Sequence, residues 1–545
     1  MSMKDILLKK ITDLKREIKP TSVFLTLALF LFIGLVFYVN LSCNPDFYHS
    51  DMYCDLNYAK EAWKSKTIFP SNWIFGNQTY VFSTPVVAAF LYGVFSNVIL
   101  SMAIASCVMT ILIVISYDWM TKPLFSYNER LTGFLVMVGI IFIRNNIATD
   151  QKGAQLFFTM ASYYSGYLIT AFVVLGCYVR IKSGISIQKN IGTLVISLVL
   201  SFCTGMQSIR QTAIMVLPLL ACESFFTLKH LIRDKTIINL KSLLYSVTIL
   251  FSNLLGIFAM NHIRINQKTF WGEPEIEISR EVLYKIRLNL NYIFELLQTT
   301  FFPYYINLIF AIGVIIFTLF AVLCCLKRTI MHKEATDLYA SLFLFYIVSC
   351  MILFCIGIFT NINMREIYYF MLFPFIALSA AYFVRNYPST KRFLYISVNI
   401  CFILLIAFET IFIAKHNEIG KSKDSFAHQA ATYATENGYS CIFAPFGCGT
   451  NIAIASNDQI SLVYFGNNDN KPLFIPIDYL CVKDSYKHVD NSKVLYYIPK
   501  NYRKECNEKA TSLGVKCDIL IEFDNGSCLC KMSKNICVIA NEQNN

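Results

Sequence analysis

Long apolar runs separated by short polar segments occupy the chain from residue 22 to residue 414. Each run is about 20 residues long, the length that an α-helix needs to cross the hydrocarbon core of a bilayer. About eleven such runs are predicted to span, at 22–42, 97–117, 131–147, 156–179, 190–206, 211–228, 241–261, 302–325, 338–359, 366–384 and 393–414. The pattern predicts an all-α polytopic membrane domain over residues 22–415.

Lys and Arg gather in alternate connections between these runs, beginning with the basic amphipathic segment 1–21. Because basic loops stay in the cytoplasm, the N-terminus is expected inside, with 22–42 as an uncleaved anchor. An odd number of spans places the C-terminus outside. We therefore expect a multi-pass protein of the plasma membrane, and the Lys- and Asn-rich, Gly-poor usage favours a bacterial one.

After residue 415 the pattern changes to short β-rich runs alternating with two amphipathic helices. The runs CIFAPF, ISLVYF, KVLYYIP, CDILIEF and SCLCKM predict strands, and SFAHQAATYATENG and RKECNEKATSLGV predict helices. Helices that alternate with strands favour a mixed sheet. Residues 416–545 are thus predicted to form a small extracytoplasmic α/β domain.

Two outer connections are long enough to carry structure of their own. The first, residues 43–97, is polar and aromatic, with a short helix predicted at 57–64 and an apolar helix opening at Pro85. The third, 262–301, has apolar residues at helical spacing from Ile276 to Leu297, which predicts a helix along the membrane surface.

The net charge of +12 has its cause in the basic inner loops, so nucleic acid is not expected as a partner. Of the nineteen cysteines, those in the first outer loop and in the tail would face an oxidising compartment, and a Cys43–Cys54 disulfide would clamp the first loop. Cys528-Leu529-Cys530 has poor zinc-site spacing. No metal ion or cofactor is expected.

The candidate chemistry consists of one carboxylate and several arginines near one membrane boundary. Asp51 could take a proton from an acceptor hydroxyl, and Arg365, Arg210 or Arg144 could bind a phosphate leaving group. This division suits sugar transfer from a polyprenyl-phosphate donor. Each residue also has a plainer interpretation, since a loop Asp often caps a helix and an Arg at a helix end often reaches for lipid headgroups.

Two neighbours of Asp51, Asp55 and His49, are secondary candidates, and Asp46 is a third polar neighbour. Asp55 and Asp46 are interpreted as helix-cap or turn residues. His49 could assist proton transfer, although a lone loop histidine usually has no such role.

The first outer loop also carries a spaced pattern. It consists of Asp51, Ala59-Lys60-Glu61-Ala62-Trp63, Pro70, Tyr80-Val81-Phe82-Ser83-Thr84-Pro85 and the apolar run from Ala88 to Phe95. This pattern resembles the first outer loop of GT-C glycosyltransferases, particularly the aminoarabinose transferases that modify lipid A and the protein O-mannosyltransferases. Met52 and Thr84-Pro85-Val86 depart from it, because the family has a second acidic residue and Lys-Pro-Pro there.

The resemblance implies Asp51 as catalytic base, a polyprenyl-phosphate sugar donor, and a glycan, lipid or protein of the cell envelope as acceptor. It also implies metal independence. Arg365 belongs to a run before Pro374 that is similar to the Arg-Tyr and Pro pattern of such enzymes. The detailed match is confined to residues 51–97 and this short run.

Three other classes of function remain open. A transporter or flippase of lipid-linked sugars would need paired ionisable residues near the bilayer midplane, and Glu223 and Glu409 lie towards span ends instead. A non-catalytic assembly or receptor protein would present the tail. A lipid-linked polymerase or ligase would use the same donor chemistry.

Overall fold

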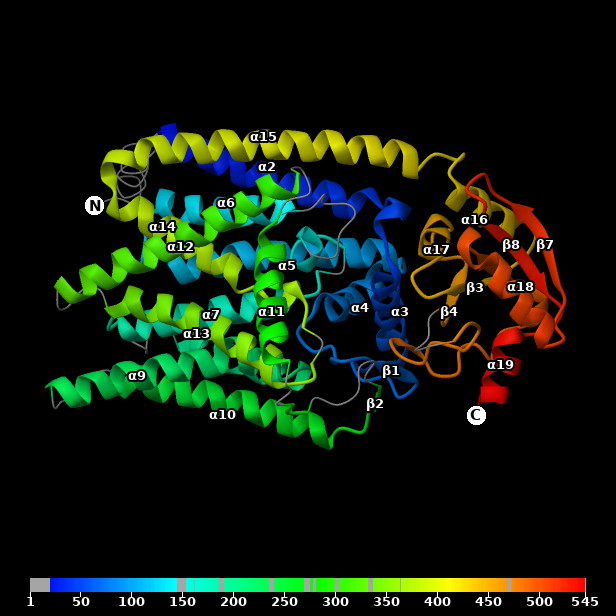
Figure 1. Ribbon diagram of the computed structural model, residues 1–545, viewed down its shortest axis with the longest axis horizontal. Coiled ribbons are helices and arrows are strands. Elements are labelled where there is room, and N and C mark those ends of the chain that lie inside the picture. Colours follow the sequence, from blue (N-terminus) through cyan, green and yellow to red (C-terminus); the bar gives the residue numbers. More distant parts are fainter. Residues whose placement is uncertain are drawn as a thin grey trace, which may run out of the picture.

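The computed structural model describes residues 20–144, 153–160, 162–185, 191–234, 240–268, 275–277, 281–298, 303–331, 337–362, 364–467 and 472–544. Figure 1 shows long helices lying side by side along the long axis, with an α/β domain at one end. The N-terminal basic segment falls outside the described residues, except for its last two positions.

Nine helices within the described residues are long and apolar enough to cross a membrane. They are α2 (Pro20–Ser42), α5 (Val98–Thr121), α7 (Ser165–Lys182), α9 (Leu217–Asp234) with η4 (Thr212–Val216), α10 (Leu240–His262), α12 (Tyr304–Met331), α13 (Asp337–Phe359), α14 (Leu372–Asn386) with η5 (Glu366–Tyr369), and α15 (Pro388–Gly420). The two other predicted spans form the helices α6 (Tyr127–Arg144), which has charges near its ends, and α8 (Ile191–Gln207), which is shorter. A helix therefore stands at each of the eleven predicted positions.

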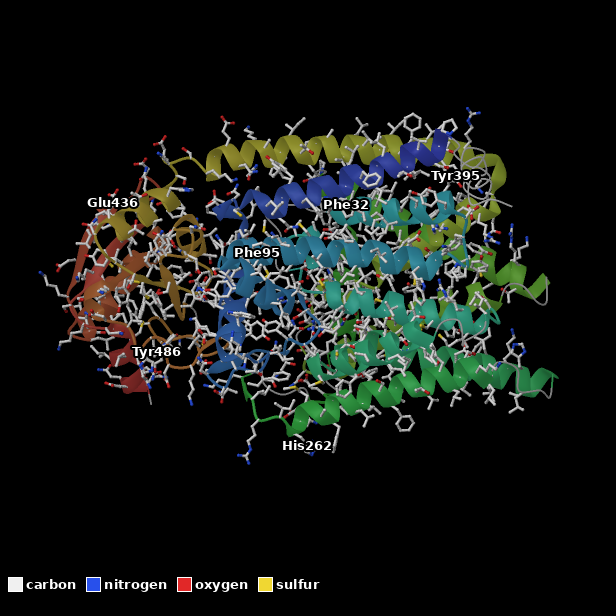
Figure 2. The ribbon with its side chains drawn as sticks, turned by 180° about the vertical axis from the view of Figure 1, so that it is seen from behind. Phe32, Phe95, His262, Tyr395, Glu436 and Tyr486 are labelled. Carbon is white, nitrogen blue, oxygen red and sulfur yellow. The ribbon has the colours of Figure 1, made fainter. Side chains whose placement is uncertain are left out.

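The outermost helices expose apolar side chains along their length. On α15, Ile400 is 54% exposed and Leu404 64% exposed, and α10 exposes Phe251 and Leu255 in the same way. Figure 2 shows carbon-rich side chains pointing outward along both helices. An apolar surface of this extent requires an apolar solvent, which supports a multi-pass membrane protein.

Helix α3 (Ser50–Ser65) begins earlier than the predicted 57–64. Its first half buries Met52, Tyr53 and Leu56 in the core. This burial outweighs the weak intrinsic helix propensity of the segment, which is why local patterns missed the extra turns. The consequence is that Asp51 stands inside the first helical turn rather than in a loop.

Two other helices of the outer connections agree with the sequence. Helix α4 (Thr84–Phe95) begins one residue before the expected Pro85, and α11 (Val282–Leu297) occupies most of the expected amphipathic stretch. Figure 1 shows α11 running across the direction of the long helices. Tyr369 of η5 donates a hydrogen bond to Asn289 Oδ1 at 2.7 Å, which fixes α11 against the N-terminal end of α14.

The C-terminal domain is a mixed five-stranded sheet in the order β4-β3-β6-β8-β7. Its elements are α16 (Phe426–Glu436), β3 (Cys441–Pro445), α17 (Thr450–Ala455), β4 (Ser461–Phe465), β6 (Val494–Ile498), α18 (Arg503–Ser512), β7 (Cys517–Glu522), β8 (Cys528–Met532) and α19 (Ile536–Asn544). Strand β3 pairs in parallel with β4 and β6, and β8 pairs antiparallel with β6 and β7. All five predicted strands and both predicted helices are present.

A second, smaller sheet joins three distant parts of the chain. Strand β1 (Trp73–Phe75) of the first outer loop pairs in parallel with β2 (Asn266–Gln267) and antiparallel with β5 (Cys481–Val482) of the tail. Such short strands have no periodic signature in the sequence, so this sheet was not predicted. It attaches the C-terminal domain to the loop that contains α3.

The nineteen cysteines are free thiols in the structure. The predicted Cys43–Cys54 disulfide is therefore wrong. Because α3 begins at Ser50, Cys54 lies one turn inside that helix on its buried face, whereas Cys43 is partly exposed after the end of α2.

Candidate active site

Helix α3 places two carboxylates one turn apart, on the same face of the helix. Asp55 is only 2% exposed, and the hydroxyl of Tyr80 donates a hydrogen bond to its Oδ1 at 2.6 Å. Burial raises the pKa of Asp55 to about 8, although the Tyr80 hydrogen bond lowers it, and the nearby Asp51 raises it further. Asp55 is thus neutral at pH 7, and its interpretation as a helix cap is wrong.

Asp51 lies in the first turn of α3 and is partly exposed. Burial raises the pKa of Asp51, and the positive charge of Arg365 lowers it. No hydrogen bond to this carboxylate is found among the described side chains and backbone groups. A carboxylate that is surrounded by protein but has its oxygens unoccupied can accept a proton from a ligand.

Arg365 and Arg210 approach this region from two different connections. Arg365 directly precedes η5 and is exposed. Arg210 follows α8, and its guanidinium lies 4.8 Å from the ring centroid of Tyr368 and 5.0 Å from that of Tyr164. Burial raises the pKa of Tyr164, whereas Arg210 and Arg365 both lower it. Arg210 and Arg365 therefore both lie close enough to Tyr164 to influence its pKa.

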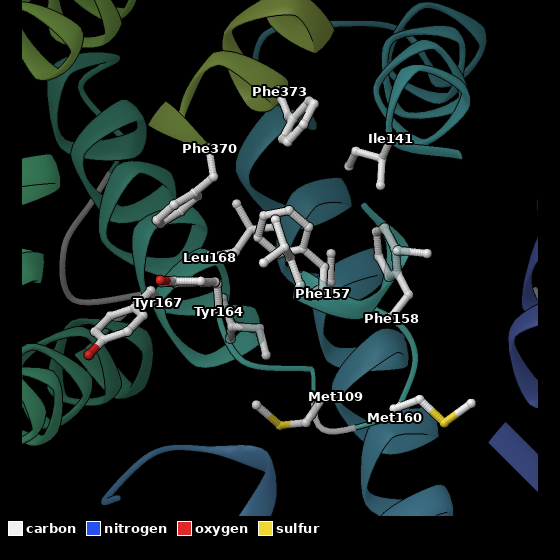
Figure 3. Close-up of a cluster of buried hydrophobic side chains, with 14 of the residues drawn as sticks. Met109, Ile141, Phe157, Phe158, Met160, Tyr164, Tyr167, Leu168, Phe370 and Phe373 are labelled. Atoms are coloured by element: carbon white, nitrogen blue, oxygen red, sulfur yellow. The ribbon is translucent and has the colours of Figure 1, made fainter. Parts of the chain in front are cut away.

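Aromatic side chains pack against Arg210. Its guanidinium is 6.0 Å from the ring centroid of Tyr167, which neighbours Tyr164 on the first turn of α7. Figure 3 shows both tyrosines at the edge of a buried hydrophobic cluster, with their hydroxyl groups pointing away from Phe157. The rings of Tyr164 and Phe370 pack 5.2 Å apart. These rings give the cation aromatic neighbours of low polarity, where its charge is screened less than in water.

Hydrogen bonds hold the first outer loop against the segment that carries Arg210. Thr79 N donates to Gln207 O at 3.1 Å, and Thr79 Oγ1 donates to Met206 O at 2.9 Å. Phe82 N donates to Gln207 Oε1 at 3.2 Å. The residue range before Arg210 is therefore fixed relative to the loop that contains Asp51 and Tyr80.

His49 and Asp46 are each in contact with other protein groups. The Nε2 of His49 lies 3.4 Å from the hydroxyl of Tyr163, and burial lowers the pKa of His49 to about 4, so the ring is neutral. Asp46 lies in the first turn of the short helix η1 (Pro45–Phe47) and accepts a hydrogen bond from Asn451 at 3.3 Å. This position agrees with a turn role.

Arg144 is the last residue of α6. Its side chain, like residues 145–152 of the following connection, lies outside what the structure describes. Its role as a phosphate ligand stays a prediction.

Sequence reasoning missed the tyrosines of the site. They are Tyr80, Tyr163, Tyr164, Tyr167, Tyr368 and Tyr479. The available signal was the density of aromatic residues in the outer connections. Among the described residues, no group of three or more His, Cys, Asp or Glu side chains is placed to hold a metal ion.

No family model and no curated protein matches the sequence. Solved structures are similar to the chain in fold. ArnT from Cupriavidus metallidurans in the apo state aligns with a TM-score of 0.53 at 11% identity, over 95% of this chain and 98% of that chain. The chain has the fold of ArnT. A second structure, ArnT from Cupriavidus metallidurans bound to undecaprenyl phosphate, aligns with a TM-score of 0.51 at 11% identity, over 94% and 98% of the two chains.

ArnT is a GT-C glycosyltransferase, and the likeness extends over nearly the whole length of both chains. It confirms the predicted fold, a GT-C-like membrane domain followed by a small α/β domain. The similarity between the chain and ArnT at this identity concerns the fold.

Proposed function

We propose that this protein is a glycosyltransferase that moves a sugar from a polyprenyl-phosphate-linked donor to a hydroxyl group of an extracytoplasmic acceptor. The observation that carries the proposal is the position of Asp51, a partly exposed carboxylate beside Arg365, in a chain with the ArnT fold. The acceptor belongs to the cell envelope and is a glycan, a lipid or a protein.

In this mechanism Asp51 is the general base. The acceptor hydroxyl gives its proton to Asp51 while its oxygen forms a bond to the anomeric carbon of the sugar, and the bond from that carbon to the phosphate oxygen breaks. Burial raises the pKa of Asp51 and so makes its carboxylate more basic, whereas Arg365 keeps it ionised. The two effects together suit a base that works near neutral pH.

The polyprenyl phosphate is the leaving group, and it keeps the electron pair of the broken bond. Arg365 and Arg210 stabilise its growing negative charge. Arginine suits this task because it stays charged and can bind two phosphate oxygens at once. ArnT has been solved with undecaprenyl phosphate bound, which supports a lipid phosphate of this kind as the donor.

Asp55 assists Asp51 by staying neutral. Two ionised carboxylates one helical turn apart would repel each other, which would raise the pKa of Asp51 further. The buried Asp55 remains protonated to about pH 8, so it adds no negative charge to the site. Its partner Tyr80 holds it in place.

The proposal needs the C-terminal domain and Asp51 on the outer side of the membrane. We expect that a tag after Asn545 is accessible from outside intact cells and that a tag before Met1 is not. Helix α3, which carries Asp51 in its first turn, lies at the same end of the bundle as the C-terminal domain (Figure 1), so one labelling experiment with a membrane-impermeant reagent tests both. Protection of the C-terminal tag would move residues 416–545 into the cytoplasm.

Binding of undecaprenyl phosphate to the purified full chain in detergent tests the function, with native mass spectrometry as the readout. We expect the wild type and Asp51→Asn to bind it, because neutralising a base does not remove a phosphate ligand. Arg365→Ala should bind at least about 10-fold more weakly, the loss expected for a charge-assisted hydrogen bond.

Arg264→Ala is the matched control, since Arg264 is an exposed arginine just beyond the outer end of α10. It would reach lipid headgroups as readily as Arg365, and it should leave binding unchanged. An equal loss in both variants, or no binding by the wild type, would contradict the proposed donor and favour a non-catalytic receptor or assembly protein.

A further inference from the structure

Helix α4 exposes apolar side chains at the end of the bundle that carries the C-terminal domain. Phe90 is 64% exposed and Val94 is 74% exposed, and they lie one turn apart on the same face of the helix. Figure 2 shows Phe95, the last residue of α4, where the long helices meet the C-terminal domain. Because α4 contains no charged residue, its exposed face requires an apolar environment.

The length of α5 places this face at a boundary of the bilayer. Helix α5 has 24 residues, whereas about 20 residues are enough to cross the hydrocarbon core. Lys122 directly follows its far end, as expected at a membrane boundary, so its first turn rises above the hydrocarbon core. Helix α4 ends at Phe95, just before α5 begins at Val98, and the two helices pack together. The C-terminal turns of α4 therefore lie between headgroups and hydrocarbon.

An indole ring and a lysine from the end of α3 border the exposed face of α4. Trp63 is partly exposed and packs on Gly93 so closely that an added Cβ there would lie 2.3 Å from its ring. Gly93 directly precedes Val94, so the ring adjoins the exposed face. The ammonium group of Lys66 lies 3.7 Å from the centroid of the Trp63 ring. Lys66 is exposed and forms no ion pair within the described part of the chain, so its charge is available to a ligand.

We propose that this surface binds an anionic phospholipid of the leaflet on the side of the C-terminal domain. The ammonium group of Lys66 binds the headgroup phosphate, and the indole of Trp63 lies at the membrane interface, where tryptophan is enriched. The acyl chains cover Phe90 and Val94. A zwitterionic headgroup binds less well, because it brings its own cation close to Lys66.

The neighbouring helix favours lipid over protein as the occupant. Helix α5, against which α4 packs, exposes Val108 and Ile115 further along its length, at the depth of the hydrocarbon. Lipid therefore contacts the helix beside α4 already, and a phospholipid on α4 continues the same environment towards the headgroups.

The lipid site lies apart from the candidate active site. Asp51 and Lys66 lie at opposite ends of the 16-residue helix α3, about 22 Å apart along its axis. The site goes beyond the proposed function and does not depend on it. A phospholipid bound to Lys66 would hold one end of α3 at the membrane surface, and so would fix the depth of the helix that carries Asp51.

Fluorescence quenching in bilayers tests the inference. The full chain is reconstituted in phosphatidylcholine vesicles in which roughly one lipid in five is phosphatidylglycerol, which makes the surface anionic. Bromine atoms on the acyl chains of one lipid at a time quench any indole that the chains contact. The quenching that is lost in Trp63→Phe measures the contribution of Trp63 and removes that of the other tryptophans.

We expect brominated phosphatidylglycerol to quench Trp63 about 5-fold beyond its share of the lipid, the effect of one lysine near anionic headgroups. Lys66→Asn should abolish this preference. Asparagine tolerates the left-handed conformation of Lys66, whose φ is 57°, so the end of α3 is kept. Lys421→Ala is the matched control, because Lys421 is an exposed lysine directly after α15, and it should leave the preference unchanged.

Four outcomes would contradict the inference. Quenching in proportion to the share of each lipid would exclude a headgroup site, and equal loss in both lysine variants would reduce it to general surface charge. Little quenching of Trp63 by either lipid would mean that a second copy or another protein covers α4. Loss of the preference when undecaprenyl phosphate is added would assign the surface to the donor lipid instead.

Discussion

Two clusters of charge lie at opposite ends of the helical bundle, and they differ in how completely they are satisfied. At the end away from the C-terminal domain, Lys182 and Glu223 form a buried ion pair at 2.5 Å. Tyr178 and Ser242 donate hydrogen bonds to the same carboxylate, and Lys182 donates to Ser341 Oγ at 2.7 Å. Four helices, α7, α9, α10 and α13, are joined in this way.

At the other end, Asp51 and Arg365 influence each other without forming an ion pair within the described residues. Arg365 is exposed, and Asp51 is partly exposed. Both ends place opposite charges near apolar surroundings, where an unsatisfied charge is costly. In the first cluster, protein groups compensate both charges. In the second cluster, we expect a ligand to compensate them.

The difference separates a structural network from the candidate site of this molecule. A buried ion pair with all its hydrogen bonds formed holds the helices in one arrangement. Removing one partner leaves the other charge buried without compensation. Two opposite charges that lie close together without a direct contact can both be stabilised by a ligand that binds between them. Variants at the two ends should therefore affect different measurements.

The largest effect is expected for Asp51→Asn, which removes the proposed base and keeps the shape of the side chain. Turnover should fall by about 10²–10⁴-fold, the usual contribution of a general base. Release of polyprenyl phosphate from a radiolabelled polyprenyl-phosphate sugar measures it. Asp55→Asn is the matched control and should cost far less. Sensitivity at Asp55 with tolerance at Asp51 would move the base one helical turn along α3.

Glu223→Gln should reduce stability rather than chemistry. Removing one partner of a buried ion pair leaves Lys182 uncompensated, at a cost of about 3–5 kcal/mol in the free energy of unfolding. Thermal unfolding in detergent and the yield of folded protein report this loss. The Lys182→Met, Glu223→Gln double variant should recover part of it. Unchanged stability in the single variant, with lost turnover, would reverse the assignment of the two clusters.

Arg365→Ala and Arg210→Ala should each lower turnover about 10²-fold without changing expression, because each removes a cation from the developing phosphate charge. Lysine at either position should restore only part of the activity, since it cannot bind two phosphate oxygens in the same fixed geometry. Full activity of both lysine variants would mean that these side chains only reach for lipid headgroups.

The last prediction concerns pH. The pKa of Asp55 rises from 3.8 to about 8 on folding, so the native state binds more protons than the unfolded state between these values. The contribution of Asp55 to stability is complete below about pH 4 and is lost as the pH rises through about 8. The Tm of the wild type should thus decline more steeply over this range than that of Asp55→Asn. Parallel curves would show that Asp55 ionises freely.

The sequence predicted the elements whose signal is local. Apolar runs located the long helices, and short β-rich runs located β3, β4, β6, β7 and β8. The early start of α3 was not visible, because Met52, Tyr53 and Leu56 are helical by virtue of what they pack against. The sheet of β1, β2 and β5 was missed because pairing between distant two- or three-residue segments has no period.

The candidate site divides in the same way. Spacing relative to Ala59 and Pro70 selected Asp51 over Asp55, and the structure gives these two residues different surroundings, one partly exposed and one buried. Arg210 and Arg365 followed from their places at helix ends. Tyr479 could not be found, because it reaches the site only through the docking of the C-terminal domain on the first outer loop.

The small sheet of β1, β2 and β5 also sets an order of assembly during biosynthesis. Strand β1 is translated early, and its partner β5 follows about 400 residues later, so the first outer loop must wait for most of the chain to be made and translocated. A nascent chain released before residue 480 would hold α3 without its tail contacts, and we expect protease to cleave residues 66–83 in it but not in the full protein. In a chain still being made, the candidate site would thus lack its tail contacts until β5 has been translated and has paired with β1.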